Sequence, residues 1–554
     1  MAINVVGLVA VVVFYVLILA IGVWASKKSK KEEKKCVGTK SEVTMVGGRN
    51  ISLLVGIFTM TATWVGGGYI MGTAEAVYSP SQGLIWATGP LAYVITFFLG
   101  GMFFAKPMRS KRYVTMMDPF QHRYGNSFTT FLLLPAVISD VLWVACILAA
   151  LGGTISLILD LSSTYAIILS AAVAITYTLL GGLYSVAYTD VIQLFFIFIS
   201  LWICVPFLVL SPAISEIKFP ALLNQSQQVH WMGELKLEDA GKWIDELLLL
   251  ALGGLSYQAL YQRILSASSS LQAQITCFSA AVLVFILGVP SVIIGAVAAS
   301  ADWNQTAYGY PPPFERGEAG KVLPLALQYL TPTWVSVLGI GAVAAAVMSS
   351  MDSVLLSSAS MIARNIYKST LRKQASDKEC LWVIRLTVLL VGLGGMGLAF
   401  VGDSVFSLWL VGGDLIYCII FPQLICVLHC PCANGYGAAT GYFFGTLLRI
   451  LSGEPLLGLT PVLLFPGWRK DEVTGVVLQY FPFRTLAMLV SLLSIPLASY
   501  LAQLIFTHHL LPHTWDILGV VKEERETAEM RDENVEEKLP TASDKLLATT
   551  STIC

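Results

Sequence analysis

Long apolar segments constrain this chain more than any other feature. Runs of roughly 20 apolar residues, the length that a helix needs to cross the hydrocarbon layer of a bilayer, recur from Ile3 to about residue 506. Charged residues make up only 12% of the sequence, against roughly 25% in soluble domains. The segments are too long for the strands of a membrane barrel. The sequence therefore predicts an all-α polytopic protein in the lipid bilayer.

A sliding window of about 19 residues divides the apolar segments into thirteen transmembrane helices. The expected spans are 3–25, 48–77, 84–105, 124–157, 163–180, 185–211, 240–266, 271–300, 322–366, 379–402, 405–430, 434–452 and 480–506. The second, fourth and ninth spans exceed the thickness of a bilayer, so we expect bends, breaks or extramembrane extensions in them. The first segment has no cleavage site of small residues, and we expect it to be retained.

The loops orient these helices. Clusters of Lys and Arg follow the first, third and ninth spans, and basic loops stay in the cytoplasm. The amino terminus is therefore expected outside and the carboxyl terminus inside. Asn224 and Asn304 begin glycosylation sequons in loops that this orientation places outside, whereas the sequon at Asn50 lies on the cytoplasmic side and is expected to carry no glycan. The acidic tail is expected to be disordered, and Leu546–Leu547 is a weak signal for trafficking adaptors.

Two glycine-rich interruptions lie inside expected helices. Gly66–Gly68 follow Trp64 in the second span, and Gly253–Gly254 precede Tyr257 in the seventh. Each glycine costs a helix roughly 1 kcal/mol relative to alanine, and a broken helix is tolerated in a bilayer only where it is buried or lines a cavity. Broken helices at corresponding positions indicate an inverted repeat with a binding site near the midplane.

The repeat predicts an organisation in which helices two to six and seven to eleven are the two halves. The expected segments are 1–47 (external terminus, first helix and basic loop), 48–211 (first repeat), 212–239 (external loop), 240–430 (second repeat, with an external loop at 301–321), 431–510 (helices twelve and thirteen) and 511–554 (cytoplasmic tail).

Several motifs resemble the sodium/solute symporter family. The two that carry the resemblance are Gly181–Gln193 (GGLYSVAYTDVIQ) and Ala346–Ser353 (AVMSSMDS), the latter followed by Ser358–Ser360. Three segments are most similar to the members of the family that carry choline: the stretch around Trp64, Phe104–Lys111 and Asp302–Gly309. The resemblance implies a five-plus-five inverted-repeat fold. It also implies chloride-dependent, sodium-coupled inward transport of choline across the plasma membrane, at a presynaptic, vesicle-associated location that supplies neurotransmitter synthesis.

Aromatic residues supply a candidate substrate site. Choline is a quaternary ammonium whose charge is spread over methyl groups, and aromatic faces attract such cations by about 0.5–2 kcal/mol for each ring. The candidates are Trp64, Tyr93, Trp143 and Tyr257, which match positions that the resemblance implies line the choline site, and Trp409. The members that carry choline read Pro-Trp where this chain has Ser256–Tyr257, and tyrosine offers a weaker π face than tryptophan.

Oxygen-bearing residues supply a candidate sodium site. Ala346, Ser349, Ser350 and Ser353 share one helix face by their spacing. The resemblance implies that sodium is bound by the Ala346 carbonyl, the Ser349 and Ser350 hydroxyls and carbonyls near Thr61 and Trp64. Asp352 is an intramembrane carboxylate and hence a functional candidate, for a second cation or an inner gate. Asp190 is expected to support the sodium site. Glu75, Asp140 and Glu454 are weaker candidates that could lend negative potential to an outer vestibule, and Glu454 could instead simply be solvated.

Three other classes of function remain open at this point. The same scaffold could carry another solute, such as a sugar or a carboxylate, although the aromatic cluster and the lack of an obvious intramembrane arginine beside it disfavour acidic substrates. It could be a choline sensor that does not transport, or a channel, although no repeated filter motif is present. We predict no enzyme, no organic cofactor and no nucleic-acid partner. The group Cys426, His429, Cys430 and Cys432 matches no zinc spacing.

Overall fold

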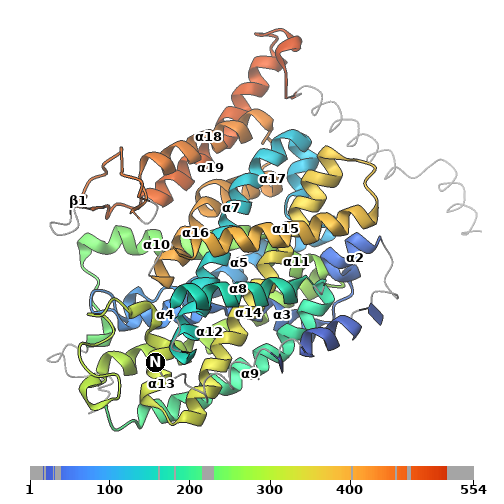
Figure 1. The fold of residues 1–554 in the computed structure, drawn as a ribbon. Helices are drawn as coiled ribbons and strands as arrows, with labels where there is room; N and C mark the ends of the chain where they lie inside the picture. The colour runs from blue at the N-terminus through green and yellow to red at the C-terminus, as the bar shows by residue number, and fades with distance from the viewer. Residues whose placement is uncertain are drawn as a thin grey trace, which may run out of the picture.

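The computed structural model describes residues 16–17, 20–28, 30–31, 39–159, 162–179, 182–214, 230–400, 404–455, 458–470, 476–518 and 520. The described chain is mostly helical and forms one bundle (Figure 1). A short antiparallel pair, β1 (Arg469–Lys470) and β2 (Val477–Leu478), lies in a loop at one side. Most of the helix expected at 3–25 lies outside the described residues, as do Asn224, Leu546–Leu547 and nearly all of the acidic tail.

The helices follow the expected apolar segments. They are α2 (Lys40–Val46), α3 (Leu53–Trp64), α4 (Gly67–Tyr78), α5 (Gly89–Leu99), α6 (Ala105–Ser110), α7 (Asp118–Leu159), α8 (Ser163–Thr178), α9 (Leu183–Val209), α10 (Ala240–Gly253), α11 (Gln258–Ser266), α12 (Ser270–Ser300), α13 (Val322–Leu330), α14 (Thr333–Met361), α15 (Asp377–Leu398), α16 (Val405–Leu415), α17 (Phe421–His429), α18 (Gly435–Leu451) and α19 (Phe483–Thr507).

Several expected spans are subdivided. The span at 322–366 is two helices, because Pro332 cannot continue α13 and instead precedes α14 in an extended conformation. The span at 405–430 joins α16 to α17 through a π-helical segment, η10 (Ile416–Ile420). Among the described residues, eight helical segments are each long and apolar enough to cross a bilayer, and the bent pair α3–α4 passes as a ninth. The count of thirteen stays a prediction.

The first glycine interruption breaks its helix. The chain turns by 51° between α3 and α4, and Val65 and Gly66 between them leave the helical conformation. Packing explains why glycine occupies this turn: a Cβ on Gly66 would lie 2.0 Å from Ser350 Oγ, and one on Gly67 would lie 2.8 Å from side chains of α7 and α14. The expected break in the second span is therefore confirmed.

The second interruption also breaks its helix. After α10, a 3₁₀ turn, η6 (Gly254–Ser256), leads to Tyr257 in an extended conformation before α11 begins. The two breaks face each other, because a Cβ on Gly254 would lie 3.3 Å from the Trp64 ring. Both breaks are buried, as a broken helix in a bilayer must be.

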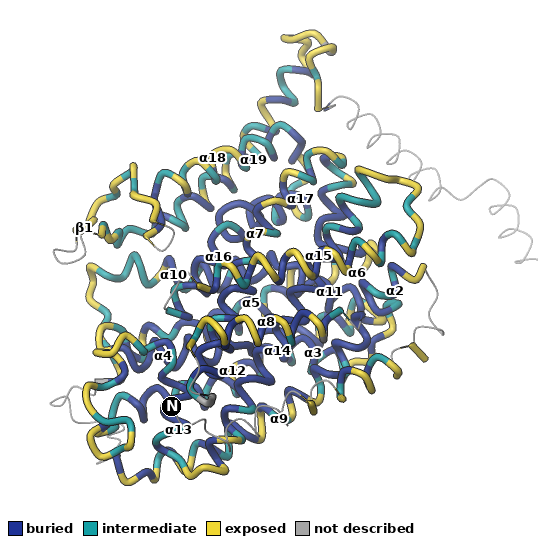
Figure 2. The backbone as a smooth tube through the Cα atoms, in the orientation of Figure 1, coloured by how far each residue is buried: buried dark blue, intermediate teal, exposed yellow. Residues whose placement is uncertain are grey.

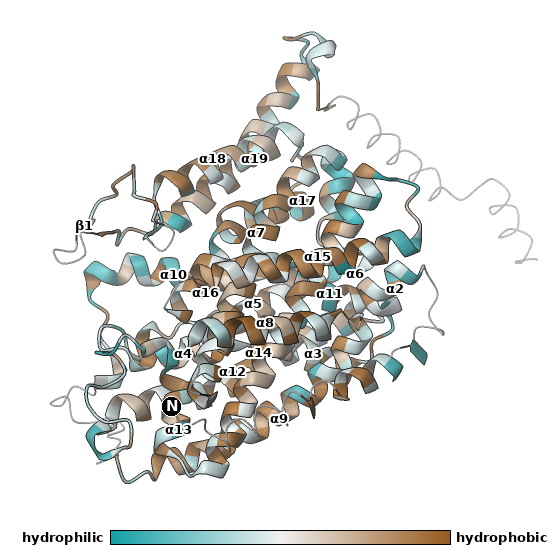
Figure 3. Ribbon diagram, viewed as in Figure 1, coloured by the Kyte–Doolittle hydropathy of each residue, from teal (hydrophilic) through white to brown (hydrophobic). Residues whose placement is uncertain are grey.

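Helix α14 forms the centre of the bundle. It packs against α9, α7, α15 and α3, and Ala342–Met361 is buried throughout its length (Figure 2). Outer helices carry apolar side chains on their exposed faces, for example Phe195 and Ile199 of α9 and Leu386 of α15, and α15 is largely apolar in Figure 3. Exposed apolar faces around a buried polar centre are the arrangement expected in a bilayer.

Helices α18 and α19 lie side by side and extend away from the main bundle (Figure 1). Gly437, Gly441 and Gly445 recur every four residues and place the α18 backbone against Ile495 and Ser491 of α19. A Cβ on Gly441, for example, would lie 2.4 Å from Ile495 Cγ1. Such small-residue stripes allow membrane helices to approach closely.

A buried ion-pair network joins this helix pair to the bundle. Arg449 of α18 donates to Asp414 of α16 at 2.7 Å through Nε and to Glu454 at 2.6 Å. Arg484 of α19 pairs with Asp414 at 3.3 Å and with Asp245 of α10 at 3.7 Å. Glu454 is thus a buried ion-pair partner, so the alternative that it is simply solvated is wrong, and a contribution to the potential of an outer vestibule stays a prediction.

Candidate functional site

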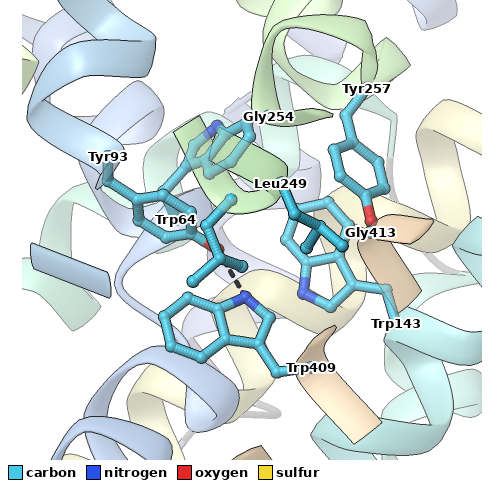
Figure 4. A pocket seen from close by; sticks show the side chains of 9 residues that line it. Trp64, Tyr93, Trp143, Leu249, Gly254, Tyr257, Trp409 and Gly413 are labelled. Atoms are coloured by element: carbon cyan, nitrogen blue, oxygen red, sulfur yellow. Dashed lines mark hydrogen bonds between the residues drawn. The ribbon is translucent and has the colours of Figure 1, made fainter. Parts of the chain in front are cut away.

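Five aromatic side chains from five separate elements line one pocket (Figure 4). Trp64 ends α3 at the first break, and Tyr257 lies at the second break. Tyr93 comes from α5, Trp143 from α7 and Trp409 from α16. The remaining walls are Leu249, Leu250, Gly254 and Gly413. The structure therefore brings together all five aromatic candidates predicted from the sequence, and none of the described residues that line the pocket is charged.

Trp64 lies at the centre of the cluster. Its ring centroid is 4.8 Å from that of Tyr93, 5.6 Å from Trp143 and 6.0 Å from Tyr257. Trp143 and Tyr257 are 4.7 Å apart, and Tyr93 and Trp409 are 5.4 Å apart. The interplanar angles of these pairs range from 50° to 90°, so the rings surround a common space instead of stacking. Aromatic faces in such a cluster attract a cation that enters between them.

Two hydrogen bonds cross the pocket, and each has one partner on α16. Trp409 Nε1 donates to the Tyr93 hydroxyl at 2.7 Å, and the Tyr257 hydroxyl donates to the Gly412 carbonyl at 2.8 Å. Trp64 Nε1 is buried and finds no partner among the described residues. A buried indole N–H without a partner is costly, so this atom is a candidate donor to a ligand.

The space between the rings is small. The cavity has a volume of about 10 Å³, which is room for about one water molecule. The five rings are between 2% and 7% exposed. A quaternary ammonium fits only after the rings separate, so the structure holds the pocket in a closed form.

The serine face of α14 lies against the first break. Ser350 Oγ donates to the Thr63 carbonyl at 2.9 Å, and a Cβ on Gly66 would lie 3.8 Å from the Ala346 carbonyl. The break therefore brings carbonyl and hydroxyl oxygens of two helices together. Thr61 is close in sequence, but its hydroxyl bonds the Ile57 carbonyl of its own helix at 2.8 Å.

Asp190 of α9 contacts both the serine face of α14 and helix α3. Ser349 Oγ donates to Asp190 Oδ1 at 2.5 Å, and Thr59 donates to Oδ2. Arg263 of α11 forms an ion pair with the same carboxylate at 3.6 Å and also bonds Ser353. Asp190 and Arg263 are both buried, so each charge is compensated by the other.

Sequence reasoning did not select Arg263. It is a fully buried arginine in the helix after the second break, one of the costliest residues in a membrane core. An arginine six residues after Tyr257, inside an expected membrane span, was the feature of the sequence that could have indicated this buried charge. It is not among the residues that line the aromatic pocket.

The other carboxylates lie apart from the aromatic pocket. Asp352 accepts a hydrogen bond from Thr178 of α8 at 2.7 Å, so at least one of its oxygens is directed towards α8. Asp140 accepts from Ser358 at 2.5 Å. Glu75 accepts from Ser404 and from the Phe406 amide at 2.7 and 3.0 Å, and so caps the start of α16.

Two surface features bear on the remaining predictions. Asn304 is exposed in the loop after α12, within a 3₁₀ turn (Trp303–Gln305). The structure therefore leaves this sequon accessible. Among the described residues, no group of three or more His, Cys, Asp or Glu side chains is arranged to hold a metal ion, so the Cys426–Cys432 group is not a metal cluster of that kind.

An apolar bundle with two broken helices that face each other at a buried pocket defines an ion-coupled membrane transporter. The chain belongs to the sodium:solute symporter family, which it matches over residues 45–445. Membership confirms the resemblance of the sequence motifs, and it also confirms a transporter rather than an enzyme.

Two relatives and one solved structure extend this comparison. The chain is 50% identical over 521 residues to the high affinity choline transporter 1 of Homo sapiens, covering 94% of this chain and 89% of that protein. It is 45% identical over 520 residues to the corresponding protein of Drosophila melanogaster, covering 94% and 82%. A substrate-bound, outward-open structure of a Na+-coupled sialic acid symporter aligns with a TM-score of 0.67 at 17% identity, covering 89% of this chain and 98% of that one. The last comparison supports the fold alone.

Proposed function

We propose that this protein carries choline into the cell across the plasma membrane, driven by the sodium gradient. The observation that carries the proposal is the pocket itself, in which five aromatic rings and no charged side chain surround one space. Choline has no N–H on its charged end, so a carboxylate would gain no hydrogen bond from it. Aromatic faces instead attract its diffuse charge. The names of the relatives support the same substrate.

The proposed sodium site lies between the first break and α14. Its ligands are the Ala346 carbonyl, the Ser349 and Ser350 hydroxyls and carbonyls near Thr61 and Trp64. The contact between Ser350 and the Thr63 carbonyl supports this assignment, because it brings both elements within the reach of one ion. Asp190 orients Ser349 from outside the ligand set.

Asp352 is proposed as a supporting carboxylate for a second cation or for the inner gate. Its hydrogen bond with Thr178 ties α14 to α8, which supports a structural coupling between these helices. Chloride dependence is proposed on the resemblance of the sequence to choline-carrying members of the family.

Alternating access is proposed as a motion of the two repeats, 48–211 and 240–430, against each other. The two breaks belong to opposite repeats and meet at Trp64 and Gly254. A sodium ion between α3 and α14 would also bridge the repeats, and a ligand shifts such an equilibrium only by its differential affinity for the two states. The amino terminus is proposed outside and the tail inside, where trafficking adaptors can reach it.

The experiment is uptake of radiolabelled choline by cells that express the protein, with sodium and with sodium replaced by a larger organic cation. Saturable uptake that requires sodium is the expected result. Sodium-dependent choline binding by the purified protein without uptake would instead indicate a sensor. An absence of choline binding at any sodium concentration would exclude choline as the substrate. Another small solute would then have to be the substrate.

A further inference from the structure

The turn that follows α17 carries two neighbouring thiols. Cys430 and Cys432 flank Pro431, and their sulfur atoms lie 3.0 Å apart. Cys432 is exposed and Cys430 is partly exposed, whereas the other six described cysteines are buried. A disulfide has an S–S distance of about 2 Å, so the two sulfurs are close to bonding distance before any oxidation.

Local structure holds the two thiols together. The Ala433 amide donates to the Cys430 carbonyl at 3.3 Å, which closes a turn over these residues. Pro431 fixes one backbone dihedral of that turn. Arg123, near the start of α7, donates to the Val427 carbonyl at 3.3 Å and to the Pro431 carbonyl. These hydrogen bonds connect the turn to the first segment of α7, ahead of the kink at Gly125.

We infer that Cys430 and Cys432 form a redox modification site that closes to an intramolecular disulfide by exchange with a small-molecule disulfide such as oxidised glutathione. This inference is independent of the proposed substrate. The exposed Cys432 thiolate attacks one sulfur of glutathione disulfide, forms a mixed disulfide and releases one glutathione. The Cys430 thiolate then attacks the Cys432 sulfur, forms the Cys430–Cys432 bond and releases the second glutathione. Two thiols are oxidised, one disulfide is reduced, and the two protons lost by the cysteines go to the departing thiolates.

The surroundings set the pH dependence of the first step. The hydrogen bond with Cys430 and burial raise the pKa of the Cys432 thiol, while the Arg123 guanidinium lowers it by a smaller amount. The buried Cys426 of α17 also interacts electrostatically with both thiols, and His429 directly precedes Cys430 in the chain. Because the thiolate is the attacking species, the raised pKa makes exchange slow at neutral pH and faster as the pH rises.

The test uses purified full-length protein in which Cys36 and Cys554, both outside the described residues, are replaced by serine. The protein is treated with glutathione disulfide, free thiols are alkylated, and peptides are mapped by mass spectrometry. The expected product is a Cys430–Cys432 disulfide that dithiothreitol reverses. Cys430→Ser should stop the reaction at a glutathione adduct on Cys432, and Cys380→Ser, a change at a buried cysteine, should leave disulfide formation unchanged.

A second measurement keeps the inference testable if exchange proves slow. Phenylarsine oxide binds two neighbouring thiols at once, so the folded protein should take up one equivalent, and Cys430→Ser or Cys432→Ser should each lose that uptake. A stable glutathione adduct on Cys432 in the parent protein, or arsenical uptake that survives both substitutions, would overturn the assignment. Size-exclusion elution compared with the parent checks that each variant is folded.

Discussion

The Trp409 indole donates a hydrogen bond to the Tyr93 hydroxyl at 2.7 Å and so ties α16 to α5 across the aromatic pocket. A second bond, from the Tyr257 hydroxyl to the Gly412 carbonyl, ties the same helix to the second break. Helix α16 is therefore the element on which both cross-pocket bonds converge. Both bonds would have to break for α16 to move away from the pocket as a rigid element.

The first prediction concerns the cage. Removing a ring that faces the substrate removes a cation–π contact of about 0.5–2 kcal/mol and leaves a cavity beside the site. We expect Trp64→Ala and Trp143→Ala each to weaken the apparent affinity for choline by about 2- to 30-fold or more, so that uptake no longer saturates at choline concentrations that saturate the parent, while the protein still reaches the cell surface. Trp382→Ala on the exposed face of α15 is the matched control and should keep uptake. Normal uptake by both pocket variants at equal surface expression would refute the cage.

The second prediction separates the ring of Tyr257 from its hydroxyl. Tyr257→Phe keeps the π face and loses only the bond to Gly412, at a cost of about 1 kcal/mol. We expect choline affinity to change by less than about tenfold, and Tyr257→Trp to retain binding. Tyr257→Ala should lose far more affinity. If Tyr257→Phe is as damaging as Tyr257→Ala in equilibrium binding, the hydroxyl and not the ring recognises the substrate.

The third prediction concerns sodium coupling. Ser349→Ala and Ser350→Ala each remove an oxygen from the proposed sodium site, so half-maximal activation of uptake should require a higher sodium concentration. Choline affinity at saturating sodium should change little. Ser357→Ala is the control, because that buried hydroxyl bonds only the Val354 carbonyl of its own helix among the described residues. Choline binding that is equally tight with and without sodium in purified protein would show that the ion does not organise the pocket.

Asp352 offers a related and stronger change. Asp352→Asn replaces a carboxylate that accepts the Thr178 hydrogen bond by a neutral amide with different hydrogen bonding. We expect this variant to lose uptake at every sodium concentration while it is still expressed at the surface. Uptake equal to that of the parent, measured at saturating sodium and choline, would remove Asp352 from the mechanism.

The fourth prediction concerns the buried pair of Asp190 and Arg263. Breaking such a pair from one side leaves an uncompensated charge and typically costs about 3–5 kcal/mol. Arg263→Gln and Asp190→Asn should therefore each lower the melting temperature of the purified protein. The double variant should be more stable than the sum of the two losses predicts, because it leaves no unpaired charge. Strictly additive losses in this cycle would mean that the two side chains do not compensate each other.

The fifth prediction concerns topology. Asn304 is exposed in the loop after α12, so endoglycosidase should remove a glycan from the parent protein and from Asn50→Gln alike. The Asn304→Gln variant should carry little or no glycan for the enzyme to remove, and any glycan that remains should be attached to Asn224. A glycan attached to Asn50 would contradict the proposed orientation.

The glycine breaks could be predicted from the sequence because their cost in a membrane helix is a local property. Gly66 and Gly254 needed no knowledge of their partners to be recognised as interruptions. The aromatic pocket depended more on the family resemblance, since no local rule brings Tyr93 and Trp409 together. Their contact is a consequence of packing between helices that are far apart in the sequence.

The polar contacts beneath the pocket could not be predicted in the same way. The pairing of Arg263 with Asp190 depends on the angle at which α11 leaves the second break, and apolar periodicity carries no information about that angle. The ion pair of Glu454 with Arg484 was likewise not predicted, because Arg484 belongs to α19 and meets Glu454 only where α18 and α19 pack together. The length of the span 322–366 predicted a bend or a break in it, but not its position at Pro332, since the apolar run continues past the proline.

The closed pocket has a calorimetric consequence. Hydrophobic association in water is driven mainly by the release of water and is marked by a large change in heat capacity. A cavity with room for about one water molecule has almost none to release, so most of the dehydration on binding must come from the ligand. Titration calorimetry of choline should therefore give a favourable enthalpy near 25 °C, as is common for ligands that enter poorly hydrated pockets.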